Sequence, residues 1–547
     1  MKKQLLTLLT GTTLLVAYAQ EDMPVVWEQK MGHRIEYNGT GTEDRGYSYA
    51  ASSKEITVFD NKTGQTKWTA SFKDIAPKLS KVDEIIPLWE SNIIFLFDRK
   101  MGKDQMACVD METGKALWTT DKYQNVSEDN MVYIPEDDAF AISLKNSLVY
   151  IKAKTGEEKW STTKFKGVVG RYVYMPDGYM VAVNFVPGSL GALFTFFKNQ
   201  IAKFNMSNGD IVWENTYIGR AERKVLTRDF IYDLDVHDGK VFLLLNGIQV
   251  YDYNTGANLY SAAFDFTPDV ISKPITAKKF GVYGVVANPY IDGQDLYVLD
   301  MANKHSQYVK KYDVNSGKLI WSSPEIREAK AIPHMIVEGD KVILQIGGAV
   351  ECQAMYIKTY EVNDVKYTYT VYKIYYRNVK PCGVQAFNTN DGSLAWDSER
   401  FKKGITNGMT INNQYIICSG TALYKLDLNN GNELYEVPVN KAGVGNATLI
   451  LPYQDMVVMV GEKGIATYKA EDGAFVCSGK YKDSEVNDMY DNILIMTTEG
   501  DDIAAFDLNT CQYKQFNARK GAVSDLSTDG KFVYVYENKV VSKLKTQ

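Results

Sequence analysis

The sequence has few of the residues from which catalytic and metal sites are usually built. It contains four histidines in 547 residues, and none lies in an HxH or HExxH pattern. Its six cysteines are widely spaced, with no CxxC, CxxCH or adjacent pair, which excludes the common zinc and covalent haem motifs. P-loop and GxSxG motifs are also absent. We therefore expect no cofactor, no metal site and no catalytic residue that a local motif would reveal.

A strong excess of charge is lacking as well. Lysine and arginine number 61 against 67 acidic residues, for a net charge of −6. No basic stretch resembles a nucleic-acid surface, so we expect no nucleic-acid partner. Aromatic residues, by contrast, are abundant: 37 tyrosines, 22 phenylalanines and 8 tryptophans. Aromatic and β-branched residues favour strands, so the composition indicates an all-β protein.

The N-terminal segment has the pattern of a secretory signal peptide. Lys2 and Lys3 precede the apolar stretch 5–16, and Ala17-Tyr18-Ala19 fits the small-x-small cleavage rule. The stretch is short for a membrane anchor, and no later segment is long and apolar enough to span a bilayer. The first cysteine is Cys108, so no lipid-anchor cysteine follows the cleavage site. We predict a signal peptide over 1–19 and a mature periplasmic or secreted protein.

One pattern recurs along nearly the whole mature chain: an apolar strand, Asp or Asn, three residues, Gly, three residues and Trp. Six of the eight tryptophans occupy this one position, which makes the repeat a strong signal. Degenerate copies carry Tyr260, Tyr435 or Cys477 in place of the tryptophan, and Cys511 in place of the glycine. We predict that these motif residues are structural: Gly64, Trp68, Gly114, Trp118, Gly156, Trp160, Gly209, Trp213, Gly317, Trp321, Gly392 and Trp396.

The motif has the chemistry of a β-hairpin turn. Glycine adopts a positive φ at little steric cost, and the Thr, Ser, Asn or Asp before it can bond the turn backbone. The acidic residue four positions earlier, Asp60 in the first copy, can accept N–H groups of the turn. Because this carboxylate recurs from copy to copy, we interpret it as holding the turn and not as catalytic. The tryptophan supplies a flat face for packing one sheet on the next.

Most neighbouring motif glycines lie 39–53 residues apart, close to the roughly 40–50 residues of a four-stranded propeller blade. Ten motifs give ten units, and second strands are predicted at 92–97, 241–245, 415–418 and 456–460. An eleventh unit is split: residues 522–525, 532–536 and 540–544 resemble its first three strands, and 25–27 near the mature N-terminus its fourth. Joining them would close a ring and remove two exposed sheet edges. We predict about eleven four-stranded units over 20–547.

The D-x-x-T-G-x-x-x-W series resembles the PQQ-like (pyrroloquinoline-quinone-like) β-propeller repeat family. The resemblance covers roughly 25–544 and is specific for the fold and weak for function. It implies either quinoprotein dehydrogenases or non-catalytic propellers such as the one in the outer-membrane β-barrel assembly machinery. Eight blades are usual there, so eleven units mean one oversized ring or two rings. The split unit, which links the two ends, favours one ring.

The quinone site that the resemblance implies is not supported by this sequence. Family enzymes are expected to stack the quinone between a tryptophan and an adjacent Cys-Cys disulfide, and no such pair exists here. Only Trp27 and Trp89 lie outside the motif, and Trp27 is expected in the closing strand. Segment 233–239 faintly resembles a calcium loop, but its glycine is in the seventh place, so strand, turn and strand fit better. A channel site assembled from acidic residues stays open, with these candidates: Asp83, Glu84, Asp233, Asp235, Glu485 and Asp488.

Three insertions interrupt the repeat, at 185–200, 288–306 and 351–381. The first carries Phe194, Phe196 and Phe197 and is either a plug over the ring or an apolar contact for a protein or membrane surface, centred on 185–197. The second is polar and is predicted to be a lengthened hairpin with no assigned role. Cys352 and Cys382 flank the third, and they either form a disulfide at its base or are free buried thiols.

The third insertion is the most aromatic and is predicted to form two long strands around 363–364. It carries Tyr367, Tyr369 and Tyr372, and tyrosine is favoured at interfaces. It is either a projecting hairpin that docks a partner or an extended blade packed on its neighbours. Our leading hypothesis is an exported, non-catalytic propeller scaffold that binds a protein or cell-envelope partner. The alternative is an exported enzyme or carbohydrate-binding protein that uses the central channel.

Overall fold

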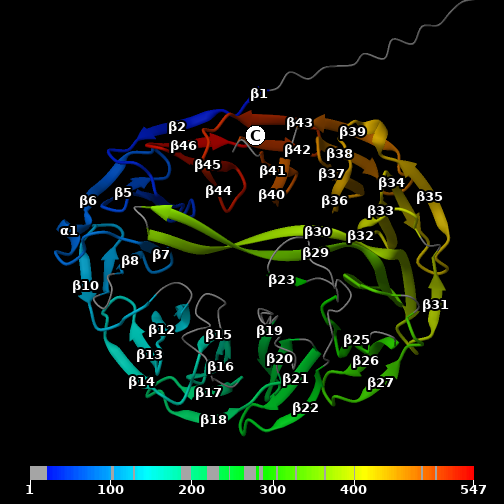
Figure 1. Ribbon diagram of the computed structural model, residues 1–547, viewed down its shortest axis with the longest axis horizontal. Coiled ribbons are helices and arrows are strands. Elements are labelled where there is room, and N and C mark those ends of the chain that lie inside the picture. The colour runs from blue at the N-terminus through cyan, green and yellow to red at the C-terminus, as the bar shows by residue number, and fades with distance from the viewer. Residues whose placement is uncertain are drawn as a thin grey trace, which may run out of the picture.

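The computed structural model describes residues 21–99, 104–126, 130–185, 199–218, 233–245, 247–263, 279–282, 287–303, 306–326, 329–362, 365–398, 401–481, 484–498 and 502–547. The predicted signal peptide and most of the 185–200 insertion, with Phe194, Phe196 and Phe197, lie outside these ranges. Within them, eleven small sheets stand side by side around one ring (Figure 1). The prediction of an all-β propeller is confirmed, and of the two alternatives the single ring is the correct one.

The first five blades follow the chain in order, each with four antiparallel strands. The short helix α1 (Phe72–Ile75) follows blade 1. The strands are β3 (Tyr37–Gly39), β4 (Tyr47–Ala51), β5 (Glu55–Asp60), β6 (Thr66–Ser71); β7 (Glu84–Leu88), β8 (Ile93–Asp98), β9 (Gln105–Asp110), β10 (Ala116–Thr120); β11 (Met131–Ile134), β12 (Ala139–Ser143), β13 (Leu148–Lys152), β14 (Glu158–Thr162); β15 (Val168–Tyr174), β16 (Tyr179–Phe185), β17 (Ile201–Asn205), β18 (Ile211–Asn215); β19 (Asp233–His237), β20 (Lys240–Leu245), β21 (Gly247–Asp252) and β22 (Asn258–Ala263).

Blades 6 to 10 continue the same order. Two 3-10 turns occur in the ring, at 135–137 in blade 3 and at 440–442 after blade 8. Two strands are added from elsewhere in the chain: β23 (Lys279–Val282) pairs with blade 7 and β1 (Glu21–Asp22) with blade 10. The blade strands are β24 (Tyr290–Asp292), β25 (Asp295–Asn303), β26 (Ser306–Asp313), β27 (Leu319–Ser322); β28 (His334–Glu338), β29 (Lys341–Val362), β30 (Val365–Asn388), β31 (Leu394–Asp397); β32 (Ile405–Ile411), β33 (Gln414–Ser419), β34 (Ala422–Leu426), β35 (Glu433–Pro438); β36 (Ala447–Tyr453), β37 (Met456–Gly461), β38 (Gly464–Lys469), β39 (Phe475–Lys480); β40 (Ser484–Tyr490), β41 (Ile493–Thr498), β42 (Ile503–Asp507) and β43 (Gln512–Phe516).

The eleventh blade closes the ring with both ends of the chain. It consists of β44 (Val523–Leu526), β45 (Phe532–Glu537), β46 (Val540–Lys545) and, from the N-terminal side, β2 (Val25–Lys30). Strands β2 and β46 run antiparallel, with Val25 opposite Leu544 and Lys30 opposite Val540. The predicted split unit is therefore confirmed. Closure pairs strands that would otherwise remain as two open edges.

The motif turn forms as its chemistry predicts. In blade 1 the Asp60 carboxylate accepts hydrogen bonds from the backbone N–H and the hydroxyl of Thr63, at 2.8 and 2.9 Å. The N–H of Gly64 donates to the carbonyl oxygen of Asp60 at 2.8 Å, and Gly64 has a φ of +71°. The same backbone bond recurs from Gly114 to Asp110 and from Gly256 to Asp252. The repeated carboxylates thus hold turns.

The motif tryptophan joins each blade to the next. The indole of Trp160 donates to the carbonyl oxygen of Met206 at 3.0 Å, and the ring lies where a side chain at Gly209 would have to be: a Cβ there would be 2.5 Å from the ring. Glycine is thus required twice, for its positive φ and for the close approach of the ring. The same pairing of an aromatic ring with the next glycine occurs for Trp27 and Gly64, Trp68 and Gly114, Trp118 and Gly156, Trp213 and Gly256, Tyr260 and Gly317, Trp321 and Gly392, Trp396 and Gly431, and Tyr435 and Gly473.

One junction uses covalent chemistry in place of this contact. Cys477 occupies the tryptophan position of blade 9, Cys511 occupies the glycine position of blade 10, and the two form a disulfide. Cys511 keeps the left-handed backbone of the glycine it replaces, with a φ of +54°. The spacing of the cysteines did not predict this bond, because the two residues are brought together only by the stacking of neighbouring blades.

A repeated buried lysine was also missed by the sequence analysis. Lys203, Lys311, Lys425 and Lys543 lie on the third strands of their blades and are all buried. Each ammonium donates to a backbone carbonyl group of the next blade, at or beside the one to which the motif aromatic side chain donates. At ring closure, Lys543 Nζ and Trp27 Nε1 both donate to the carbonyl oxygen of Asn61, each at 3.0 Å. Lysine is common at turns and edges, so its sequence position alone carried no sign of burial.

Packing follows the same nearest-neighbour scheme. The core is a series of clusters, each shared by two adjacent blades: one joins Tyr49 and Val58 of blade 1 to Ile94 and Leu96 of blade 2. Within segment 288–306, β24 and β25 are the first two strands of blade 6, and β25 pairs with β26 as far as Asn303 opposite Ser306, which fits the predicted lengthened hairpin. Segment 233–239 forms β19 and a turn at Asp238 and Gly239, which confirms the strand-turn-strand interpretation.

Candidate functional site

The feature that departs most from the blade pattern is the hairpin formed by β29 and β30. The two strands stay in register from Lys341 opposite Asn388 to Val362 opposite Val365, far beyond the end of the blade. Figure 1, which looks down the short axis of the ring, shows this hairpin crossing the middle of the ring toward the side of β7. The predicted pair of long strands is confirmed, and they are directed inward over the ring in this view.

The base of the hairpin is built around two glycines. Gly347 and Gly348, with φ values of +64° and +89°, form a bulge where the register shifts. A Cβ on Gly347 would lie 2.1 Å from the carbonyl oxygen of Pro381, and one on Gly348 would lie 2.5 Å from that of Ile405 in blade 8. The side chain of Gln345 donates to the carbonyl oxygen of Gly347 at 2.9 Å. The hairpin therefore leaves its blade at a bend with no room for side chains.

Strand β23 pairs with the part of β29 that projects beyond blade 7. Lys279 lies opposite Met355 and Val282 opposite Cys352, so a segment between blades 5 and 6 in the sequence adds a third strand to the projecting part. On the other side, β30 pairs with β31 only from Gln385 to Phe387, with one further bridge from Cys382 to Phe401. Within the described ranges, the edge of β30 over 365–375 has no other strand beside it.

For the tyrosines predicted as partner contacts, the structure gives the position of the backbone. Tyr367, Tyr369 and Tyr372 lie on the projecting part of β30, opposite Tyr360, Lys358 and Met355. The structure describes the backbone over 351–375 but not the side chains. Tyr376, nearer the base, has an exposed side chain. The backbone thus brings the predicted tyrosines together on one projecting strand.

Of the two alternatives for Cys352 and Cys382, the disulfide at the base of the hairpin is not formed. Cys382 is buried and carries a free thiol, whose sulfur lies 3.3 Å from the carbonyl oxygen of Val379. The alternative interpretation, a buried free thiol, is the one that holds for Cys382. The side chain of Cys352 is outside the described part of the chain.

The acidic residues proposed for a channel site lie in three groups, at the first strands of blades 2, 5 and 10, and several of them have local partners. Asp83 accepts from the N–H of Arg99 at 2.9 Å, and Glu84 forms an ion pair with the Arg99 guanidinium. Asp235 contacts the His237 ring at 2.8 Å. Among the described residues, no three His, Cys, Asp or Glu side chains gather as metal ligands would. Asp83 and Glu84 thus both contact Arg99, and the three groups of acidic residues stand on different blades.

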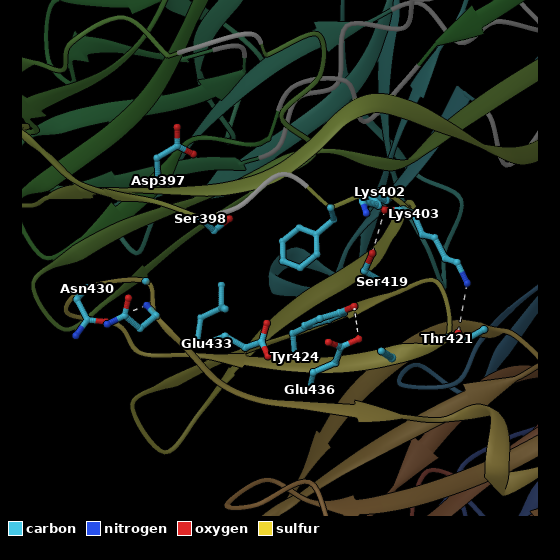
Figure 2. Close-up of a pocket in the computed structure, with 15 residues that line it drawn as sticks. Asp397, Ser398, Lys402, Lys403, Ser419, Thr421, Tyr424, Asn430, Glu433 and Glu436 are labelled. Atoms are coloured by element: carbon cyan, nitrogen blue, oxygen red, sulfur yellow. Dashed lines mark hydrogen bonds between the residues drawn. The ribbon is translucent and has the colours of Figure 1, made fainter.

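A second candidate site is a pocket of about 700 Å³ at the junction of blades 7 and 8. Figure 2 shows the rings and polar side chains that surround it. Phe401 and Tyr424 form its aromatic part, with ring centroids 5.1 Å apart and planes at 68°. Its other lining residues are mostly polar and come from both blades. Neither the repeat pattern nor any motif indicated this pocket, because its lining combines a strand end with the face of the next blade.

No helix of the described chain is long and apolar enough to cross a membrane.

No curated protein sequence matches the chain. Residues 2–184 match the family model described as outer membrane protein assembly factor BamB. BamB from Moraxella catarrhalis is similar at 14% identity, over 73% of this chain and 96% of that one, with a TM-score of 0.30. The designed protein Ika8 shows 12% identity over 71% of this chain and 100% of that one, with a TM-score of 0.35.

The match to the family model lies in the part of the chain with the most regular motif copies. It spans the first three blades and part of blade 4. The aromatic-on-glycine junctions then continue the same repeat past this region to Gly473. The chain is therefore an eleven-bladed β-propeller, and its residues 2–184 are similar to the family described as outer membrane protein assembly factor BamB.

Proposed function

We propose that this protein is an exported, non-catalytic scaffold that binds a protein partner of the cell envelope through the β29–β30 hairpin. The observation that carries the proposal is the edge of β30 over 365–375, which has no neighbouring strand within the described chain. An exposed edge presents a row of backbone N–H and C=O groups that an extended segment of a partner can pair with. Tyr367, Tyr369 and Tyr372 lie on this strand and are the proposed partner contacts.

The envelope location rests on two observations. Residues 1–19 have a signal-peptide pattern, and β1 begins at Glu21, so cleavage after Ala19 would leave every described strand in place. The matching family model names an outer membrane assembly factor, which supports a scaffold role at that membrane. A peripheral contact of 185–197 with a membrane surface stays a prediction from sequence.

The rigid base makes the hairpin suitable for docking. Because Gly347 and Gly348 lie against Pro381 and Ile405, the hairpin is held at a defined angle to the ring. A strand presented in a fixed direction loses less conformational entropy when a partner binds than a free loop would.

Site-specific photocrosslinking tests the proposal. A photoreactive phenylalanine analogue would replace Tyr367, Tyr369 or Tyr372 in turn, and Leu117 on the outer strand of blade 2, which is 45% exposed, as the control position. We expect crosslinks in intact cells from the three hairpin positions to one envelope protein, and none to that protein from Leu117.

A shortened variant provides the second arm. Residues 351–376 would be replaced by Asn-Gly, which links Val350 to Arg377, a paired position of the hairpin, through a favoured two-residue turn. The blades should remain folded and the crosslinked partner should no longer co-purify. Co-purification that is unchanged by the shortening, or equal crosslinking from Leu117, would contradict the proposal.

A further inference from the structure

The pocket at the junction of blades 7 and 8 lies where the outer strand of blade 7 is shorter than that of blade 8. Strand β31 ends at Asp397, whereas β35 of the next blade continues to Pro438. Trp396 still packs on Gly431, as at other junctions. Beyond it, no described residue of β31 covers the face of blade 8 that carries Tyr424 and Glu436, and an opening of about 700 Å³ lies there. That volume is within the usual range for small-ligand sites.

Two aromatic rings form the apolar part of the pocket. Phe401 meets Tyr424 edge to face, and both side chains are only partly buried. The Tyr424 hydroxyl donates to the Glu436 carboxylate at 2.9 Å, which orients both groups. Burial, together with Glu436, raises the pKa of Tyr424 to about 12, so the hydroxyl keeps its proton at neutral pH. The remaining apolar lining is limited to Ala422 and Leu426.

Polar groups surround the rings and carry both signs of charge. Asp397, Glu433 and Glu436 supply carboxylates, while Lys402 and Lys403 supply ammonium groups on another side of the pocket, as Figure 2 shows. Lys403 lies 3.5 Å from the Thr421 hydroxyl. The other polar groups are the side chains of Ser398, Ser419, Asn430 and Asn432. Because the charges nearly balance, the pocket has no strong preference for a polyanion or a polycation.

We propose that this pocket binds a short segment of an oligosaccharide. A sugar ring presents C–H groups on its faces, which can pack on Phe401, and hydroxyl groups at its edge. Carboxylates such as Glu433 accept hydrogen bonds from neighbouring hydroxyls, and amides such as Asn432 can both donate and accept. A peptide would need deeper apolar space for an anchor side chain, which this lining does not supply. The site is separate from the hairpin and does not depend on the proposed partner.

Titration calorimetry with defined probes tests this inference on the full mature chain. The probes are maltohexaose, cellohexaose and chitohexaose, with pentalysine as a peptide probe. We expect at least one hexasaccharide to bind, and Phe401→Ala to weaken it by about tenfold or more. Glu433→Ala should weaken the same sugar, since its carboxylate would no longer accept from the hydroxyls. Phe475→Ala removes an exposed ring on blade 9, 52% exposed, and should leave binding unchanged.

Each other outcome would overturn the inference. These are no binding of any hexasaccharide at millimolar concentration, equal losses in the Phe401 and Phe475 variants, or binding of pentalysine alone. Thermal melting of the Phe401→Ala variant separates loss of the site from loss of the fold, and Glu433→Ala, at an exposed position, provides a second variant that should fold normally. The crosslinks from the hairpin should persist in both variants, so failure of this site and failure of the scaffold proposal are distinguishable.

Discussion

Cys477 and Cys511 are joined by a disulfide across the junction of blades 9 and 10, at the two positions where other junctions place an aromatic ring on a glycine. The bond therefore substitutes for a contact that nine other junctions of the ring make by packing. Disulfides persist in oxidising compartments, which agrees with the proposed export. The disulfide thus stands at the same two repeat positions that an aromatic ring and a glycine occupy at the junctions into blades 1 to 9.

The first prediction concerns this junction. Replacing both cysteines by serine should lower the free energy of unfolding by about 2–4 kcal/mol, because a 34-residue separation is no longer closed. The pair Cys477→Trp with Cys511→Gly should recover part of that loss. Urea unfolding with and without reductant measures both effects. The recovered variant should be insensitive to reductant, and a tryptophan-glycine pair no better than serine would contradict the equivalence of the two junction types.

The second prediction concerns the close approach of Trp160 to Gly209. Gly209→Ala should destabilise the protein by roughly 2–5 kcal/mol, since it combines a positive φ with a Cβ 2.5 Å from the indole. Gly178→Ala is the matched control, because Gly178 has a φ of +82° with nothing within 4 Å of its Cβ. It should cost only about 1–2 kcal/mol. Equal losses in urea unfolding would show that the ring contact adds nothing.

The third prediction concerns the buried lysine at ring closure. The Lys543 ammonium lies 3.0 Å from Glu43, and its side chain is 3% exposed. Lys543→Met should cost about 2–4 kcal/mol, because it leaves the Glu43 carboxylate without its cation. Adding Glu43→Gln should restore part of the loss. Lys545→Met, at an exposed position on the same strand, is the control and should stay within about 0.5 kcal/mol of the wild type in the same assay.

The fourth prediction concerns acid stability. Hydrogen bonds from Thr255 hold the pKa of Asp252 below its ordinary value of 3.8, and bonds from Ser316 do the same for Asp313. A carboxyl whose pKa is lower in the folded state stabilises the fold above pH 3.8 and loses that contribution as pH falls through the folded pKa. Urea unfolding at several pH values should therefore show the free energy of unfolding falling as the pH drops below about 4.

A variant isolates the turn carboxylate. Asp252→Asn keeps an oxygen that accepts the turn bonds but has no charge to titrate, so its stability should fall less between pH 4 and pH 2 than that of the wild type. A parallel decline in the two proteins would mean that other carboxyls govern the acid transition.

The sequence by itself was enough to predict the four-stranded blade and its turn. Alternating apolar strands, the Asp60-type carboxylate, the glycine and the tryptophan are all local, and each hairpin turn depends only on residues within one repeat. The split eleventh unit was also predictable, because its four strands keep the pattern even though they lie at opposite ends of the chain. These features follow from short-range backbone chemistry.

Only the tertiary structure decided what depends on neighbours. The Cys477–Cys511 disulfide, the burial of Lys543 and the pocket beside Phe401 all lie between blades, and two positions that meet across a junction can be 34 residues apart or, at ring closure, 500. The direction of the β29–β30 hairpin likewise depends on Gly348 lying against Ile405 of the next blade. A repeat pattern specifies which side chains leave a sheet, whereas stacking around a closed ring determines which of them meet.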